Sequence, residues 1–342
     1  MVLRLLPEVP LYDILAKMNK AQGIKLSIVI PLYNEAENLP ELYKQITASC
    51  GNLVIPFEMV FVDDGSTDNS FQVLKELEAG DPRLKIIRLR RNFGQTAALS
   101  AGFDYARGEI IITLDADLQN DPGDFPLLIG KIEEGYDIVS GWRLKRKDKL
   151  LSRRLPSVAA NRIISWITKV KLHDYGCTLK AFRKDIVKNI KLYGEMHRFI
   201  PAIASTMGVT IAEVRVNHRP RTHGKSKYNI SKSIRVFLDL LTVKFLLTYS
   251  TRPLQAFGLF GLITGGIGGI LALILSYERL ILRVGISNRP LLLLAILLIV
   301  IGFQFITMGL LGEIMVRSYH ETAEKHIYVI REVVDSERED EP

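Results

Sequence analysis

Between residues 26 and 141, short apolar segments alternate with segments whose apolar residues recur at helical spacing. The first kind predicts strands and the second predicts helices. The expected strands are 26–30, 57–62, 85–89, 109–114 and 137–140, and the expected helices are 36–49, 68–79 and 95–106. Such alternation is typical of stacked βαβ units, so the pattern predicts an α/β domain with a mostly parallel sheet.

Two later segments, 254–276 and 290–312, contain no charged residue. At about 1.5 Å per residue each forms a helix roughly 34 Å long, which is enough to cross a hydrocarbon core of about 30 Å. A buried helical hairpin in a soluble protein is the alternative, but such helices seldom run this far without a charge. The pattern therefore favours two transmembrane helices.

The composition fits a chain with a globular part and a membrane part. Of its 342 residues, 48% are hydrophobic, whereas the 24% that are charged are too many for a protein that lies wholly in lipid. The expected division is an N-terminal helical extension at 1–24, a globular domain at 25–230, an interfacial amphipathic helix at 231–252, the two transmembrane helices within 253–316, and a tail at 317–342. A core helix is the alternative for the interfacial segment.

Positive charge gathers just before the first apolar segment. The residues are Arg219, Arg221, Lys225, Lys227, Lys232, Arg235, Lys244 and Arg252, and they are opposed by Asp239. Because basic flanks stay on the cytoplasmic side, the globular domain and both termini are expected in the cytoplasm of a multi-pass plasma (inner) membrane protein. Cys50 and Cys177 form no Cys-x-x-Cys motif, so neither a zinc site nor a disulfide framework is expected.

Polar motifs follow three of the predicted strands. They are Pro31-Leu-Tyr-Asn-Glu35, Val62-Asp-Asp-Gly-Ser-Thr-Asp68 and Asp115-Ala-Asp-Leu-Gln119. Each motif alone has an ordinary explanation as a turn or a helix N-cap. Ligands of open α/β sheets bind beyond the carboxyl ends of the strands, so three motifs at three such ends predict a ligand site.

Asp115 and Asp117 stand two positions apart at a strand end, so both side chains point to the same side of the pleat. Two close carboxylates need a cation, and Mg²⁺ or Mn²⁺ is commonly held by one or two carboxylates together with substrate phosphates. A glycosidase acid and nucleophile is the alternative, but adjacent positions on one strand suit a shared ion better. The sequence has no Gly-x-x-x-x-Gly-Lys-Ser/Thr and no Gly-x-Gly-x-x-Gly after a strand, which disfavours kinase-like and nicotinamide-dependent interpretations.

In this order the three motifs resemble those of glycosyltransferase family 2, which has the GT-A nucleotide-diphospho-sugar transferase fold; the resemblance covers about residues 25–230. The chain is more closely similar to polyprenyl-phosphate glycosyltransferases, such as dolichyl-phosphate mannose synthases. Two spans after the catalytic domain look like the branch that glucosylates undecaprenyl phosphate. The resemblance implies that the nucleotide-sugar pocket includes Pro31, Tyr33, Glu35, Val62, Asp64, Asp115, Ala116 and Asp117, and that the metal ligands are Asp117 and Gln119.

The resemblance also implies groups that bind phosphate and groups that act in catalysis. The phosphate-binding residues would be Arg143, Arg221 and Lys227, and the catalytic residues would be Asp115, Asp117, Arg143 and Asp174. Asp174 begins Asp-Tyr-Gly-Cys-Thr-Leu-Lys-Ala-Phe-Arg, where the family more often has Asp-x-Thr-x-Gly-Phe-Arg. The alternative for the basic residues is contact with anionic lipid, worth about 1 kcal/mol each near the headgroups.

The reaction that the resemblance implies is inverting transfer of one sugar, most favourably glucose from UDP-glucose, to polyprenyl phosphate by a membrane-bound hexosyltransferase. A lipid phosphate with a second pKa of about 6 is largely dianionic at neutral pH, so it needs no strong general base. GDP-mannose and a modified arabinose donor stay open. A polysaccharide synthase is disfavoured because the sequence lacks Gln-x-x-Arg-Trp and further spans, and a transporter because the spans lack an acid or base.

The expected partners are the nucleotide sugar, polyprenyl phosphate and membrane lipids, and not nucleic acid. Glycines 261, 265 and 269 are spaced by four within the first span. Small residues at this spacing allow helices to approach closely. They predict packing between the two spans or between identical subunits of a homo-oligomer.

Overall fold

The structure is a computed structural model that describes residues 24–143, 165, 170–190, 192, 196–220, 253–283, 285, 289–322 and 326–335. The chain divides into two compact units, one made of 1–240 with 326–342 and the other of 241–325. We call the first the catalytic unit and the second the hairpin. The N-terminal extension and the interfacial helix predicted at 231–252 lie outside the described residues, apart from Ile24.

The catalytic unit is built on one sheet, which has eight strands within the described residues, in the order β7-β5-β6-β4-β1-β2-β3-β8. The pairings of β1 with β2, β1 with β4, β2 with β3 and β5 with β7 are parallel, whereas β6 and β8 run antiparallel to their neighbours. The predicted mostly parallel sheet is confirmed. The strands are β1 Leu26–Leu32, β2 Phe57–Asp63, β3 Leu84–Leu89, β4 Ile110–Thr113, β5 Ile138–Trp142, β6 Lys180–Arg183, β7 Ile211–Arg215 and β8 Ile330–Val334.

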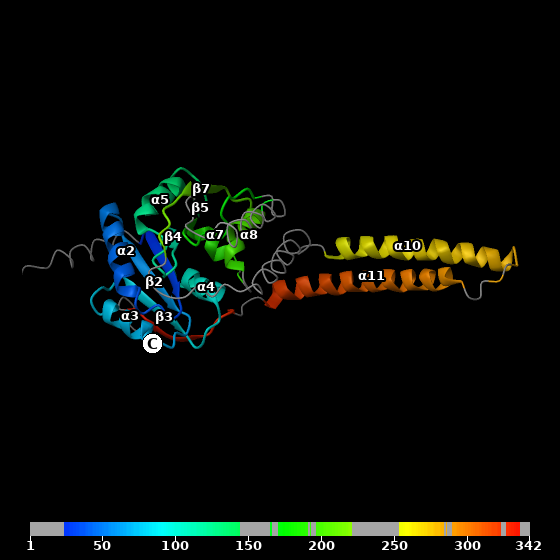
Figure 1. The fold of residues 1–342 in the computed structure, drawn as a ribbon, viewed down its shortest axis with the longest axis horizontal. Coiled ribbons are helices and arrows are strands. Elements are labelled where there is room, and N and C mark those ends of the chain that lie inside the picture. Colours follow the sequence, from blue (N-terminus) through cyan, green and yellow to red (C-terminus); the bar gives the residue numbers. More distant parts are fainter. Residues whose placement is uncertain are drawn as a thin grey trace, which may run out of the picture. The chain divides into compact units, whose positions relative to one another are not determined.

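Helices cover both faces of the sheet, as Figure 1 shows. The longer ones are α2 Leu39–Leu53, α3 Ser70–Glu78, α4 Gln95–Tyr105 and α5 Phe125–Glu133, and the shorter ones are α7 Lys184–Asn189, α8 Ile200–Ala204, η1 Pro122–Asp124, η3 Met196–Phe199 and η4 Ser205–Met207. The three predicted helices are present. Helix α2 begins three residues later than its apolar pattern predicts, because Glu35 to Asn38 form a turn closed by the Asn38 N–H donating to the Glu35 carbonyl (2.9 Å).

The core follows from the alternation of side chains along the strands. Residues Leu26, Ile28 and Ile30 of β1 pack in one cluster with residues of α2, α3 and α5, while the intervening Val29 lies on the side of α4. Gly102 of α4 approaches β1 so closely that a Cβ there would lie 2.2 Å from Val29 Cγ1. Burial on both faces is what a parallel sheet covered by helices requires.

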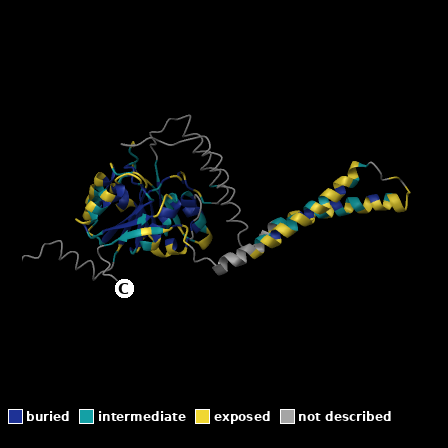
Figure 2. Ribbon diagram, turned by 90° about the horizontal axis from the view of Figure 1, so that it is seen from below, coloured by how far each residue is buried: buried dark blue, intermediate teal, exposed yellow. Residues whose placement is uncertain are grey.

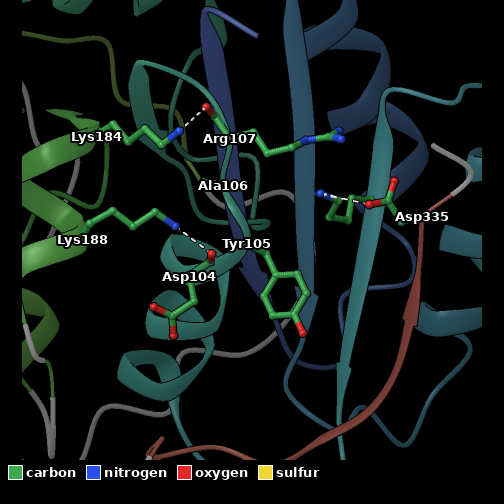
Figure 3. Close-up of a pocket in the computed structure, with 8 residues that line it drawn as sticks. Asp104, Tyr105, Ala106, Arg107, Lys184, Lys188 and Asp335 are labelled. Carbon is green, nitrogen blue, oxygen red and sulfur yellow. Dashed lines mark hydrogen bonds and ion pairs between the residues drawn. The ribbon is translucent and has the colours of Figure 1, made fainter. Parts of the chain in front are cut away.

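Strand β8 was not expected, because the sequence predicts a simple tail at 317–342. The structure instead pairs β8 antiparallel with β3, so the chain returns to the catalytic unit after the hairpin. Buried Lys85 lies between Asp335 (3.1 Å) and Glu58 (3.7 Å), and the Tyr328 hydroxyl donates to Asp104 Oδ2 (2.7 Å). Lys85, Asp104 and Asp335 are among the residues that line a cavity of about 400 Å³ at the amino edge of the strands (Figure 3).

The hairpin consists of α10 Pro253–Leu280 and α11 Pro290–Thr322. Its apolar runs, Phe257–Leu280 and Pro290–Gly312, have mean hydropathies of 2.1 and 2.8, and both are long and apolar enough to span a membrane. Only 17% and 11% of their most apolar windows are buried, and Figure 2 shows the exposed residues along both helices. A hydrophobic helix pair with so much exposed apolar surface is unlike the core of a soluble protein.

Small residues bring α10 and α11 together. A Cβ on Gly302 of α11 would lie 2.6 Å from the Gly265 nitrogen and 2.7 Å from the Gly261 carbonyl, and one on Gly268 would lie 2.8 Å from the Ala295 carbonyl. The predicted packing between the two spans is therefore present. The prediction is wrong for Gly269, because a Cβ added there would have no atom within 4 Å.

Candidate functional site

The sheet brings the predicted motifs to a single edge. Strands β1, β2, β4 and β5 run in the same direction, so the segments that follow them meet at their carboxyl ends. Strand β6 runs the opposite way and therefore begins at this edge with Lys180. The loop at 174–179 thus joins the site, although in sequence it lies about 60 residues after the carboxylate pair.

The first two motifs are joined by hydrogen bonds. The Asn34 N–H donates to Ser66 Oγ (2.9 Å), and Asn34 Oδ1 accepts from the Thr67 N–H (2.8 Å). The Glu35 N–H donates to Ser70 Oγ (2.9 Å). Asn34 has a φ of 58°, a left-handed conformation that asparagine tolerates better than most residues. These bonds fix the wall of the site that the sequence assigns to the nucleotide.

The predicted nucleotide residues of this wall differ in exposure. Pro31 and Val62 are paired across β1 and β2 and are buried, so they set the position of the wall from within the sheet. Tyr33 is 37% exposed and is available to a ligand. Glu35 is half-buried and accepts a hydrogen bond from Asn38 Nδ2 (2.6 Å).

Asp64 connects the second motif to the loop before α4. Its two carboxylate oxygens accept the N–H groups of Phe93 (2.7 Å) and Gly94 (2.9 Å). Burial raises the pKa of Asp64, and these two hydrogen bonds oppose that shift. Gly65, with a φ of 70°, touches the backbone of Arg91 so closely that a Cβ would lie 2.5 Å away. Asp64 therefore holds the 91–94 loop in place, whatever contact it also makes with a nucleotide.

Asp115 and Asp117 follow β4 as predicted. The predicted alternation along the strand does not orient them, because β4 ends at Thr113 and Asp117 lies in a turn. Burial and then the charge of Asp117 raise the pKa of Asp115 well above its usual range, because two carboxylates share a poorly solvated place. Gln95 Nε2, in the first turn of α4, donates to Asp115 Oδ1 (2.8 Å). The sequence patterns did not identify Gln95 as a site residue, and only the fold brings the start of α4 to this carboxylate.

The residues after the pair make a tight turn. Leu118 has a φ of 60°, and the Gln119 N–H donates to Asp117 Oδ1 (3.2 Å). Ala116 is buried beneath the turn and belongs to the core cluster. Asn120 then forms a bridge with His218, which attaches the loop to the segment after β7.

This donor set fits a divalent ion that also binds substrate. Among the described residues, no group of three or more His, Cys, Asp and Glu side chains could hold a metal ion. Asp115, Asp117 and the Gln119 amide could supply a few hard oxygen donors. Mg²⁺ in proteins is usually held by one or two carboxylates and completes its shell with water and substrate phosphates, so the small donor set suits it.

Arg143 and Asp174 form a buried ion pair beside the carboxylates. Arg143 Nε donates to Asp174 Oδ2 (2.7 Å) and a terminal nitrogen donates to Oδ1 (2.9 Å), in a bidentate geometry. The two side chains are 12% and 4% exposed. Although burial opposes it, Asp174 raises the pKa of Arg143 above its usual value. The guanidinium is therefore a fixed positive charge close to Asp115.

Lys180 is a second buried cation at this edge, which the sequence patterns did not single out. Its ammonium group donates to the carbonyls of Cys177 and Tyr175 and is only 3% exposed as a residue. Burial lowers the pKa of Lys180, and the negative charges of Asp174 and Asp115 are among the effects that oppose this shift. Buried charges are rare without a functional or structural partner, so Lys180 belongs with the candidate site.

His197 is buried beside the same edge. Its Nδ1 is 2.9 Å from Thr96 Oγ1, and Arg198 Nε lies 3.4 Å from its Nε2. Burial, Arg198 and Lys180 lower the pKa of His197 to about 3, so the ring is neutral at physiological pH. We therefore assign His197 to packing between η3 and α4 rather than to acid–base work. Arg221 and Lys227, the remaining predicted phosphate ligands, lie outside the described residues.

Comparisons with known proteins agree with this geometry. Residues 27–191 match the glycosyl transferase family 2 model. The dodecaprenyl-phosphate galacturonate synthase of Rhizobium johnstonii is 42% identical over 92% of this chain and 95% of its own length. An undecaprenyl-phosphate 4-deoxy-4-formamido-L-arabinose transferase of Yersinia enterocolitica is 40% identical over 94% of this chain and 97% of its own. The chain belongs to glycosyl transferase family 2, and these relatives are polyprenyl-phosphate sugar transferases.

Solved structures support the fold. Glucosyl-3-phosphoglycerate synthase from Mycobacterium tuberculosis, in complex with Mn²⁺, uridine diphosphate and phosphoglyceric acid, aligns with a TM-score of 0.51 and 18% identity, over 67% of this chain and 82% of that chain. Mannosyl-3-phosphoglycerate synthase from Rubrobacter xylanophilus aligns with a TM-score of 0.50 and 16% identity, over 68% and 77%. The predicted GT-A fold is confirmed. The relatives named above carry galacturonate or formamido-arabinose in their names, whereas the sequence favoured glucose.

Proposed function

We propose that the protein is a membrane-bound inverting glycosyltransferase that moves one sugar from a nucleotide sugar to a polyprenyl phosphate. The observation that carries the proposal is that the Asp115–Asp117 carboxylates follow β4 at the edge of a GT-A sheet where β6 begins with buried Lys180, opposite Thr113, and where nearly buried Arg143 follows β5. A pair of acids beside fixed positive charge suits a reaction that moves phosphate-linked groups. The two relatives, which align over nearly their whole length, support the polyprenyl-phosphate acceptor.

The wall formed by the first two motifs would bind the nucleotide. Tyr33 and Glu35 supply exposed and half-buried polar groups there, and Asp64 fixes the neighbouring 91–94 loop. Because loops 33–36 and 66–70 are tied to each other, this wall is set before the donor arrives. Such preorganisation reduces the free energy lost on binding.

Asp117 and Gln119, together with Asp115, would hold a Mg²⁺ or Mn²⁺ ion next to the donor diphosphate. The bound ion would neutralise negative charge on the departing nucleotide. Mn²⁺ and uridine diphosphate are named together in a structure of similar fold, which supports a divalent ion without choosing between the two metals. Gln95 restrains Asp115, so that the carboxylate pair keeps its direction.

Arg143 and Lys180 would bind phosphate oxygens and favour the approach of a dianionic acceptor. Preorganised charge of this kind acts strongly in a site that excludes water. A dianionic lipid phosphate attacks without a general base. His197, whose pKa burial lowers to about 3, would be too weak a base for that role. Direct attack by this oxygen inverts the anomeric centre, so an α-linked donor gives a β-linked product.

The hairpin would place the acceptor site at a membrane. The pairing of β8 with β3 in the sheet of the catalytic unit supports an arrangement in which the residues before α10 and those after α11 lie on the same side of the membrane. The basic residues before α10 support the cytoplasmic side. The proposed location is the inner membrane with both termini cytoplasmic.

The test is transfer by the purified full-length protein in vesicles that contain polyprenyl phosphate. Radiolabelled UDP-glucose, UDP-galacturonate, UDP-4-deoxy-4-formamido-L-arabinose and GDP-mannose are offered one at a time, with Mg²⁺ or Mn²⁺. We expect one donor to give a lipid with a single sugar, and chelation to stop the reaction. Glucose follows from the sequence, whereas galacturonate and formamido-arabinose follow from the relatives. A polymeric product would instead support a polysaccharide synthase, and no product from any donor would contradict the proposal.

A further inference from the structure

Glu213, in the edge strand β7, makes an unusual set of contacts for an edge residue. Its carboxylate accepts the backbone N–H groups of His173 (2.9 Å) and Asp174 (3.0 Å), and its Oε2 is 2.7 Å from His173 Nδ1. The side chain is only 11% exposed. One carboxylate thus holds two successive peptide groups and a ring nitrogen of the loop before β6.

The loop that Glu213 holds carries the partner of Arg143. Asp174 accepts two hydrogen bonds from the Arg143 guanidinium and is almost fully buried. The His173 ring stacks on Trp142, with centroids 4.2 Å apart and planes 15° from parallel. Trp142 immediately precedes Arg143 at the end of β5. Glu213 therefore restrains the segments on both sides of the ion pair.

The register of the sheet explains this reach. Strand β7 pairs with β5, with Glu213 opposite Ser140 and Arg215 opposite Trp142. Glu213 is therefore level with the position three residues before Arg143 on the neighbouring strand β5. From there its side chain reaches the loop that contains His173 and Asp174. Without the carboxylate, the backbone N–H groups of buried Asp174 and exposed His173 would both lose their acceptor. The loop would move to find water, and Asp174 would move with it.

We propose that Glu213 is a positioning residue for the transfer reaction: it holds Asp174, and through Asp174 it aims Arg143 at the substrate phosphates. This inference rests on the proposed function, because it assumes that Arg143 binds phosphate there. Glu213 itself touches no reacting atom. Its effect is on the direction of a cation, and a displacement of about 1 Å in a catalytic group can cost about 100-fold in rate.

The test is a double-mutant cycle on the full-length protein in vesicles, with the donor found active in the panel above. Glu213→Ala should lower kcat/KM by about 10- to 100-fold. Glu213→Gln, which keeps one acceptor oxygen, should fall between the wild type and Glu213→Ala. In an Arg143→Ala background, Glu213→Ala should change kcat/KM by less than about twofold, because residues that act through one another are not additive.

Two further measurements separate positioning from general damage. Glu332→Ala, in the opposite edge strand β8 and ion-paired with Arg88 (3.4 Å), is the matched control and should keep wild-type kcat/KM. Glu213→Gln and Arg143→Ala should both weaken binding of the nucleoside diphosphate without its sugar. The melting temperature of Glu213→Gln should equal that of the wild type. Wild-type kcat/KM in both Glu213 variants, or the same fold loss with and without Arg143, would overturn the inference. A fully active Arg143→Ala protein would remove the phosphate-binding role of Arg143 itself, and an inactive wild type would refute the proposed function.

Discussion

The buried pair between Arg143 and Asp174 predicts a large and specific effect for Asp174→Asn. The wild-type contacts are 2.7 and 2.9 Å long, and both side chains are nearly removed from water. At an effective dielectric constant of about 20, two charges roughly 4 Å apart attract by about 4 kcal/mol. Removing one partner of a buried pair commonly costs about 3–5 kcal/mol, because the other charge stays unpaired.

Asparagine keeps one of the two acceptor oxygens of Asp174 and places an NH₂ group where the other stood. One hydrogen bond to Arg143 is retained and one becomes a clash of donors, so we expect a loss of about 2–4 kcal/mol in the free energy of unfolding. For a unit of this size that corresponds to roughly 5–15 °C in melting temperature. The freed guanidinium should also lower kcat/KM by about 100-fold or more.

The assay for Asp174→Asn combines thermal unfolding in detergent with the rate of sugar transfer in vesicles. Glu109→Gln is the control, because Glu109 forms an exposed ion pair with Lys25 (3.2 Å). Exposed pairs contribute about 0–1 kcal/mol, so this variant should melt and turn over like the wild type. An Asp174→Asn protein that melts within about 1 °C of the wild type and keeps its transfer rate would show that the pair neither stabilises the fold nor directs Arg143.

Two predictions concern the other parts of the chain. Gly302→Leu should force α10 and α11 apart, because its Cβ alone would lie 2.6 Å from the Gly265 nitrogen, whereas a Cβ at Gly266 meets nothing within 4 Å. Cross-linking between one cysteine introduced in each helix should be lost with Gly302→Leu and kept with Gly266→Leu. Loss in both variants, or in neither, would contradict this contact. Asp335→Ala should release β8, because it removes the closer of the two partners of buried Lys85. The cost should be about 1–3 kcal/mol, since Lys85 keeps its contact with Glu58 (3.7 Å). Limited proteolysis should then cut the C-terminal segment faster, and an unchanged cleavage rate would mean that backbone pairing alone holds the strand.

The strands that could be predicted from the sequence are those with strong apolar runs. Strands β1 to β5 are mostly buried on both faces, and their sequences are rich in Val, Ile, Leu and Phe. Strands β6, β7 and β8 are four or five residues long and carry charges at their ends or centres. Local pattern cannot separate such short polar strands from loops, and the insertion of β6 between β4 and β5 depends on long-range pairing.

Only the part of the candidate site that lies in one local motif could be predicted from the sequence. Asp115 and Asp117 stand two positions apart in the loop that follows β4, so the sequence alone places them together. Gln95, Lys180 and Glu213 come from three separate elements, and no local motif links them to the carboxylates. Their recruitment follows from the sheet order, which brings the start of β6 and the edge strand β7 next to β4 and β5.

Asp64 shows a different limit of motif-based prediction. The motif marks it as a nucleotide contact, and the structure shows both of its oxygens accepting backbone N–H groups from residues 93 and 94. A carboxylate at a strand end can shape a site by fixing a neighbouring loop as well as by touching the ligand. The sequence cannot distinguish the two because the loop lies about 30 residues further along the chain.

The most direct test of the central claim is the transfer rate of Asp117→Asn beside that of Asp121→Asn. Asp121 lies in the same loop but pairs with Arg219 (2.7 Å). If the Asp115–Asp117 pair holds the divalent ion of the site, Asp117→Asn should lower kcat by about 1,000-fold, since roughly 4 kcal/mol of charge stabilisation is removed. Its melting temperature should stay that of the wild type. Asp121→Asn should stay within about threefold of the wild type. An Asp117→Asn protein that transfers sugar at the wild-type rate would contradict the account.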